Sequence, residues 1–121
     1  MAKLISAWLQ PSMIVNHYLC AMILYNVTII LDEEIHTDWL TWMKQQHIPE
    51  VMDTSCFASY RMLKVLDSPN EGVTYCIQYV ADTIEDYNRY LLNYAPALRA
   101  TFPEKFSNKF VIYRTVMEFI D

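Results

Sequence analysis

The segment that most restricts the fold of this chain is residues 22–31, MILYNVTIIL. One row of alternate residues in it consists of Ile23, Tyr25, Val27, Ile29 and Leu31. The other row consists of Leu24, Asn26, Thr28 and Ile30. Successive side chains of a strand point to opposite faces of a sheet, so a strand with large apolar side chains in both rows is covered on both faces. The segment therefore predicts a central β-strand that has further structure on each side.

A first helix is expected after this strand. Asp32 is placed to cap its N-terminus, and the two glutamates that follow are favourable in a first turn because they lie at the positive end of the helix dipole. Apolar residues continue at helical spacing as far as the region of His47. Pro49 should end or interrupt the helix near His47 or Ile48, because proline lacks a backbone N–H and clashes with the preceding turn.

Three more segments have strand patterns. Residues 56–66 form a second strand, and residues 73–81 form a returning strand with two alternating rows of side chains. The stretch between them, DSPNEG at 67–72, has the composition of a hairpin turn or short loop. The residues from Asn108 onward form a last long strand. The two central segments therefore predict a hairpin, with the last strand added after a second helix.

The second helix is expected to begin at Asp82 or Thr83. Each of these residues has an acid three positions later, as in a capping box. An apolar stripe follows, formed by Ile84, Tyr87, Leu91, Tyr94 and Leu98. Pro96 should break or kink this helix and can start a second short one, because proline is tolerated in a first helical turn.

The order β-α-β-β-α-β defines the fold class. Right-handed crossovers and adjacent hairpins turn this order into an α+β, ferredoxin-like domain, a four-stranded antiparallel sheet with two helices on one face. The two helices leave the other face of the sheet open, and soluble monomers rarely expose an apolar face of that size. We therefore expect a two-fold homodimer through this sheet face, of the dimeric α/β-barrel type.

Composition excludes several kinds of function. The chain of 121 residues is one domain in length, and its single glycine, Gly72, excludes a glycine-rich phosphate loop. A net charge of -5 argues against a nucleic-acid partner or an anionic membrane surface. Three cysteines without a C-x-x-C pair indicate a reducing, cytoplasmic setting, with buried free thiols favoured over a bridge between Cys56 and Cys76. We expect no metal and no cofactor, because no histidine, cysteine or carboxylate set has ligand spacing.

Residues 1–21 differ from the rest of the chain. They carry one charged residue, Lys3, and the clean strand pattern starts only at Met22. We interpret them as an upstream extension, from a start assigned too early or from a weakly ordered segment, and residues 22–121 as the domain. An ordered segment and an export signal are the alternatives. The apolar stretch is too short and too interrupted to span a membrane.

Several separated blocks of the chain resemble an uncharacterised bacterial family, domain of unknown function 4286, which is found largely in the Bacteroidetes. The blocks are YNVT (25–28), WLTWMKQQHIPEVM (39–52), TYCIQY (74–79), DYNRYLLNYAPALR (86–99) and RTVMEF (114–119). The resemblance runs from Met22 to the C-terminus and leaves out residues 1–21. It implies a ferredoxin-like fold of the dimeric α/β-barrel type, and it implies no reaction and no catalytic residues.

A candidate pocket is expected between helices and sheet. Its candidate residues are His47, Trp42, Tyr25, Tyr79, Arg61 and Arg114. His47 lies beside the proline break, where a C-terminal helix position favours the charged imidazole. In a pocket it could act as a base near pH 7 or ligate haem iron, whereas in a plain core it bonds a backbone carbonyl where the helix stops. His36, eleven residues earlier, is expected at the surface and too far away to share a metal with it.

Tyrosines and mid-strand arginines give the pocket its other candidates. The chain has nine tyrosines, which suit core and dimer packing and can also stack on a flat aromatic ligand. Arg61 and Arg114 lie within strands, where a charged side chain must face solvent, pair with an acid or bind a carboxylate.

Two functions from different classes follow. The first is a non-catalytic dimeric module, structural or ligand-binding, which takes a small aromatic ligand if it takes any. The alternative is a cofactor-free oxygenase or isomerase, or a haem-binding enzyme, acting on a flat organic molecule, and it rests on fold analogy. A cavity of ~300 Å³ or more, lined by Tyr and Trp with a converging His or Arg, would favour ligand binding or catalysis over a purely structural role.

Overall fold

The computed structural model describes residues 21–121, and the expectations about residues 1–20 lie outside that part of the chain. Its helices and strands, in chain order, are β1 (Ile23–Leu31), α3 (His36–Trp42), the π-helical η1 (Met43–His47), α4 (Ile48–Asp53), β2 (Ser59–Lys64), β3 (Val73–Ala81), α5 (Ile84–Asn93), α6 (Ala95–Ala100), the 3-10 turn η2 (Glu104–Phe106) and β4 (Phe110–Glu118).

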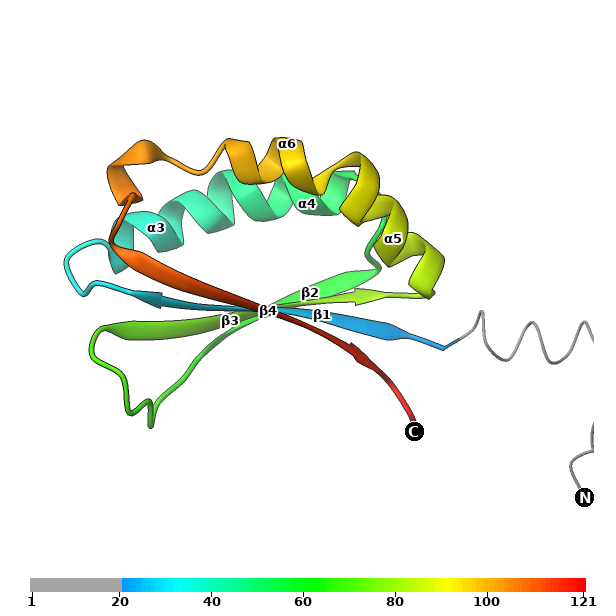
Figure 1. The fold of residues 1–121 in the computed structure, drawn as a ribbon, viewed down its shortest axis with the longest axis horizontal. Helices are drawn as coiled ribbons and strands as arrows, with labels where there is room; N and C mark the ends of the chain where they lie inside the picture. The colour runs from blue at the N-terminus through cyan, green and yellow to red at the C-terminus, as the bar shows by residue number, and fades with distance from the viewer. Residues whose placement is uncertain (1–20) are drawn as a thin grey trace, which may run out of the picture.

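The four strands form one antiparallel sheet in the order β2-β3-β1-β4. The two central strands, β1 and β3, pair over their full lengths, with Tyr25 opposite Tyr79. All the helices lie on one face of the sheet (Figure 1). The α+β, ferredoxin-like β-α-β-β-α-β fold predicted from the sequence is therefore confirmed.

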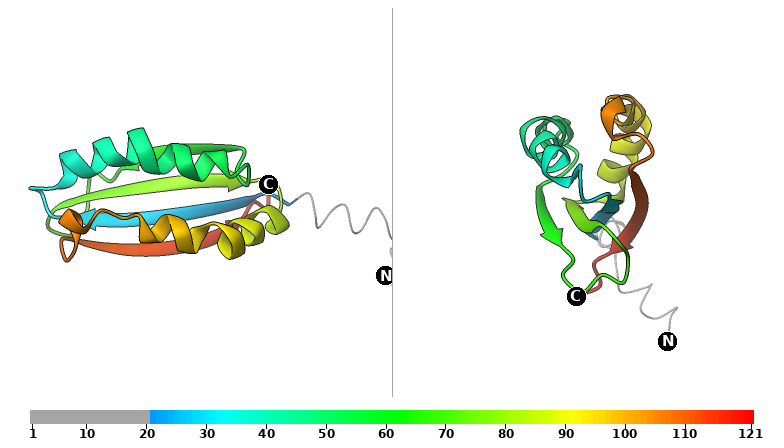
Figure 2. Two further views of the ribbon diagram at one scale, coloured as in Figure 1. Left: turned by 90° about the horizontal axis from the view of Figure 1, so that it is seen from above. Right: turned by 90° about the vertical axis from the view of Figure 1, so that its left-hand side faces the viewer.

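The helices form two rods that lie side by side over the sheet. One rod is α3, η1 and α4, on the β2 side, and the other is α5 and α6, on the β4 side (Figure 2). The helix-facing row of the central strands is almost fully buried beneath them. The space that the two rods and the sheet enclose is where side chains from all of these elements meet.

The first rod differs from the prediction at its start. Asp32 does not cap it, because α3 begins at His36 with Ile35 at the N-cap position. The Asp32 N–H bonds the Lys109 carbonyl. The interruption predicted near His47 and Ile48 is present, but the rod does not end there. The chain passes through the wider π-turn of η1, in which the Ile48 N–H bonds the Met43 carbonyl, and then continues as α4.

The second rod follows the prediction at its start and at its proline. The Thr83 hydroxyl accepts a hydrogen bond from the Asp86 N–H, which makes Thr83 the N-cap of α5. α6 begins at Ala95, with Pro96 in its first turn. The predicted apolar stripe is only partly buried. Tyr87 and Tyr90 are buried, whereas Ile84, Leu91 and Tyr94 are 36–37% exposed.

Gly72 ends the loop before β3 and is required there. Its φ of +86° lies in the left-handed region, and a Cβ at this position would lie 2.2 Å from the Leu31 carbonyl oxygen. Only glycine accepts both the conformation and the close approach. The strand predicted over 56–66 is shorter, Ser59–Lys64, and the segment before it instead buries Cys56 and Phe57 in the core.

The open face of the sheet is mixed rather than wholly apolar. One continuous row across it is polar and consists of Arg61, Gln78, Asn26 and Thr115. Apolar rows lie on both sides of it. Val111 and Tyr113 on the edge strand β4 are 50% and 57% exposed. No helix among residues 21–121 is long and apolar enough to cross a membrane.

Candidate functional site

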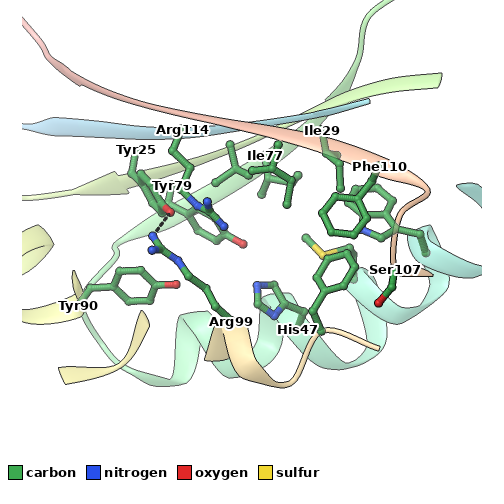
Figure 3. A pocket seen from close by; sticks show the side chains of 15 residues that line it. Tyr25, Ile29, His47, Ile77, Tyr79, Tyr90, Arg99, Ser107, Phe110 and Arg114 are labelled. Carbon is green, nitrogen blue, oxygen red and sulfur yellow. Dashed lines mark hydrogen bonds between the residues drawn. The ribbon is translucent and has the colours of Figure 1, made fainter. Parts of the chain in front are cut away.

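A cavity of about 340 Å³ lies between the two helical rods and the covered face of the sheet. It is lined by 15 side chains, which come from three strands, from both rods and from the segment between α6 and β4 (Figure 3). Its volume is within the range of small-molecule sites, which begins at ~300 Å³. The cavity has two chemically different ends.

Three tyrosines form the polar end. Tyr25 and Tyr79 lie opposite each other on neighbouring strands, with ring centres 6.0 Å apart, and Tyr90 approaches Tyr25 from α5 at 5.9 Å. Burial raises the pKa of Tyr90 to about 12, although Arg99 and Arg114 oppose the rise. Burial also raises the pKa of Tyr79. The Tyr79 and Tyr90 hydroxyls are therefore protonated at pH 7 and can donate hydrogen bonds.

Two arginines stand at the same end. Arg114 reaches in from β4 and Arg99 from α6, and both point toward the Tyr25–Tyr79 pair (Figure 3). The Arg99 guanidinium donates a hydrogen bond of 3.3 Å to the Tyr25 hydroxyl. Both arginines keep part of their surface in solvent. They therefore give this end of the cavity two positive charges at its opening.

Apolar side chains form the other end. Phe110 and Phe102 contact each other there, with ring centres 4.6 Å apart, and Ile29 and Ile112 form the sheet side. Trp39 is 1% exposed, and its indole nitrogen Nε1 is buried without a hydrogen-bond partner. A buried N–H that lacks a partner among the described residues 21–121 carries an energetic cost.

His47 lies between the two ends and faces the cavity (Figure 3). Burial, together with the positive charge of Arg114, lowers its pKa from 6.5 to about 4. The ring is therefore neutral at pH 7, which is the form that a base in a pocket requires, although a C-terminal helix position would favour the charged form. Its Nδ1 is buried without a partner, and it makes no capping hydrogen bond.

The structure brings four of the six candidate residues together around the cavity: Tyr25, Tyr79, His47 and Arg114. Trp42 lies behind His47 and stacks on it at 4.9 Å, with no place in the lining. Arg61 is on the opposite face of the sheet. It pairs with Gln78, and successive residues of a strand alternate between faces, so it cannot reach the cavity.

Arg99 and Tyr90 are two of the lining residues that sequence reasoning missed as site members. Arg99 is four residues after the fully buried Ala95, which places it on the inward side of α6. That signal is readable only once α6 is known to cover the sheet. His36 was expected at the surface, but it is half-buried, and its Nδ1 lies 3.1 Å from the Tyr75 hydroxyl.

Neither a metal set nor a disulfide accompanies the cavity in the described part of the chain. No group of three or more His, Cys, Asp or Glu side chains comes together among residues 21–121. Cys56 and Cys76 are both free thiols. The Cys56 thiol lies near the Thr54 carbonyl, and Cys76 lies beside the Thr28 hydroxyl on the open face.

Solved structures share this fold at low sequence identity. SnoaB, a cofactor-independent oxygenase from Streptomyces nogalater, has a TM-score of 0.58 and 12% identity over 83% of this chain and 94% of its own. An ethyl tert-butyl ether d (EthD) family protein from Bacillus halodurans has a TM-score of 0.59 and 10% identity, over 81% and 99%. A dimeric ferredoxin-like protein from an uncultured marine organism has a TM-score of 0.53 and 12% identity, over 84% and 97%. At these identities the likeness shows the fold alone.

Sequence comparison gives one family and no curated relative. The model of the family described as "Domain of unknown function (DUF4286)" matches residues 22–120. No curated protein matches the chain.

Proposed function

This chain belongs to the DUF4286 family, whose description assigns no activity, and we propose from the cavity itself that the domain binds a small, flat organic molecule between its helices and its sheet. In this proposal the domain is a non-catalytic binding module. The observation that carries it is a cavity of about 340 Å³ that is aromatic at one end and carries phenols and arginines at the other.

A plain structural core would not look like this. Protein interiors are packed to the density of organic crystals, and voids larger than a water molecule are few. Here a void of about 340 Å³ lies between the helices and the sheet. Its lining includes two arginines and no acidic residue, which supports a ligand site over a packing defect.

Binding is favoured over catalysis by the groups that line the cavity. They include no carboxylate and no cysteine, so neither a carboxylate base nor a thiol nucleophile is present among them. His47 is neutral and accessible to a ligand, but a pKa of about 4 makes it a weak base for removing a proton at pH 7.

The alternative function is a cofactor-free oxygenase or isomerase with His47 as its base. Its support is the position of His47 in the cavity and the fold shared with SnoaB. A bound anion next to His47 would raise the pKa of the imidazole and strengthen it as a base. In the haem-binding form of this alternative, His47 is the one histidine of the cavity lining that could ligate the iron.

We further propose that the domain is a homodimer through the open face of its sheet. Val111, Tyr113 and Met117 project from that face on β4 and are exposed in the single chain. A protein of this fold from an uncultured marine organism is described as dimeric. A second copy laid face to face would cover the apolar rows, which supports a two-fold interface.

Filling the cavity tests the proposed binding function. Protein purified from its source organism should carry a retained small molecule, seen in native mass spectrometry as a mass excess that denaturation releases. Val27→Phe puts a larger ring into the cavity from the central strand and should abolish that excess, with the fold retained by circular dichroism.

Val116→Phe is the matched control. It makes the same change on the same side of the sheet, at an exposed position outside the lining, and should keep the ligand. A retained molecule present at equal occupancy in Val27→Phe would show that it binds elsewhere and would contradict the proposal.

A further inference from the structure

We propose that the ligand of this cavity is an organic carboxylate, held through its anionic group by Arg99 and Arg114 while its apolar body lies against Trp39 and Phe110. The inference rests on the proposed binding function and adds the chemical class of the ligand.

The first support is a charge imbalance at the polar end. Arg99 and Arg114 both line the cavity, and none of the residues that line it is acidic. The ion pairs of the described residues lie elsewhere, Arg89 with Asp86 and Lys109 with Glu34. The whole chain carries 14 acids against nine basic residues, yet two arginines meet here without a counter-ion from residues 21–121. An anion supplied by a ligand would complete this end.

The second support is that one arginine is already held in place. The Tyr25 hydroxyl accepts a hydrogen bond from Arg99, and the Tyr25 ring is packed among Phe57, Tyr79, Tyr87 and Tyr90. Tyr25 is 2% exposed and therefore provides a rigid anchor. A guanidinium fixed before binding loses less conformational entropy when it pairs with a carboxylate.

The third support is the distribution of polar groups along the cavity. Donors gather at one end, where the two guanidinium groups stand beside the Tyr79 and Tyr90 hydroxyls, and aromatic rings gather at the other (Figure 3). A ligand with one compact anionic group and a flat apolar body matches both ends at once. The neutral His47 adds no positive charge between them, so the charge recognition stays at the arginine end.

Matched acid and amide probes test the inference. Benzoate, naphthoate and phenylacetate are each titrated against the full chain beside their primary amides, by calorimetry and by NMR of the Trp39 indole N–H. Each acid has nearly the shape of its amide and differs in charge. We expect the acids to bind at least about tenfold tighter, the size of a charge-assisted hydrogen bond converted to affinity.

Variants assign that preference to the two arginines. Arg99→Gln and Arg114→Gln should each reduce the ratio of acid to amide affinity, and the double variant should bring it near one. Lys64→Gln removes one positive charge at an exposed position of β2 outside the lining and should leave the ratio unchanged. Circular dichroism and thermal melting confirm that each variant is folded.

The outcomes separate the two proposals. Equal binding of acids and amides would overturn the carboxylate inference and leave the binding function standing. An acid preference that survives in the double variant, or inorganic phosphate that binds as tightly as naphthoate, would also overturn the inference. Failure of every acid and every amide to bind or to shift the Trp39 signal would contradict the binding function together with the inference.

Discussion

His47 shows how one side chain can report on the whole cavity. It is stacked on Trp42, it faces two arginines, and its Nδ1 has no partner. Burial and the charge of Arg114 both disfavour the protonated ring. Folding therefore requires a neutral imidazole, whereas the unfolded chain protonates it with an ordinary pKa of 6.5.

This difference predicts a pH-dependent stability. Between pH 6.5 and about 4 the unfolded chain binds more protons at His47 than the folded chain does, so stability is complete above that window and is lost as the pH falls through it. The loss between about pH 7 and about pH 5 should be about 1–2 kcal/mol in urea denaturation. His47→Gln should lack this component, and His36→Gln should retain it. An unchanged pH profile in His47→Gln would show that the imidazole is not held neutral by the fold.

The surroundings of His47 could not be predicted from the sequence alone. The residues that surround it come from η1, α6 and β4, which are far apart in the chain. Its neighbour Pro49 predicted a helix end or interruption near His47, and the interruption is present as the π-turn, but the burial of the ring depends on the other elements. Tyr25 and Tyr79, in contrast, could be placed from strand alternation, because that pattern is local.

The π-turn is the element that accommodates Pro49. In a regular α-helix the proline ring clashes with the carbonyl four residues earlier, at Gln45. The five-residue turn Met43–His47 widens the helix just before the proline, and its Ile48 N–H bonds a carbonyl five residues back. The rod can then continue as α4 and still bury Ile48 and Val51. π-Turns of this kind are frequent at functional sites, and this one carries His47.

Deleting one residue from the π-turn tests this account. Removal of the exposed Gln45 would return the rod to α-helical spacing and bring the proline back against a carbonyl, which should cost about 3 kcal/mol of stability in urea. The same deletion combined with Pro49→Ala should cost far less, because alanine removes the clash. An equal cost of the deletion in both backgrounds would show that the turn exists for another reason.

The sequence predicted the start of a helix correctly where the determining contact lies within a few residues of that start. Thr83 caps α5 through the Asp86 N–H three residues away, and Pro96 starts α6 within its own first turn. Asp32 has the same local signal but does not cap α3, because that helix begins only at His36, with Ile35 at the N-cap position. The Asp32 N–H bonds the Lys109 carbonyl, a contact with a distant part of the chain that no window of sequence around Asp32 contains.

At the scale of the whole molecule, strand order and helix placement were predictable, and the cavity was not. The order of elements and the handedness of crossovers leave few topologies, so the sheet β2-β3-β1-β4 follows from the pattern. Whether the two rods pack against each other or leave a cavity depends on side chains such as Arg99 of α6 and Phe102 of the segment that follows it. The face assignment of Arg61 needed the register of β2 against β3, which the loop before Val73 did not specify.

The polar row across the open face has a consequence for assembly. Asn26 in this row is only 8% exposed, and its side-chain oxygen is buried without a partner. Its side-chain nitrogen donates to Thr28. If two sheets pack face to face, the Arg61 and Gln78 donors of the same row in a second copy can approach this oxygen. The polar row would then set the alignment of the dimer, while the apolar rows supply the buried area.

A lysine on the open face should therefore dissociate the dimer. Wild-type protein is expected to sediment as a dimer at micromolar concentration, with an interface that buries more than ~1,000 Å². Tyr113→Lys places an unpaired charge in that interface and should weaken association by about 2 kcal/mol or more, beyond tenfold in Kd. Val116→Lys, on the same strand but on the helix side, makes an equal change in charge and should remain dimeric. Wild-type protein that sediments as a monomer, or equal weakening by the two lysines, would show that the open face is not the contact between copies.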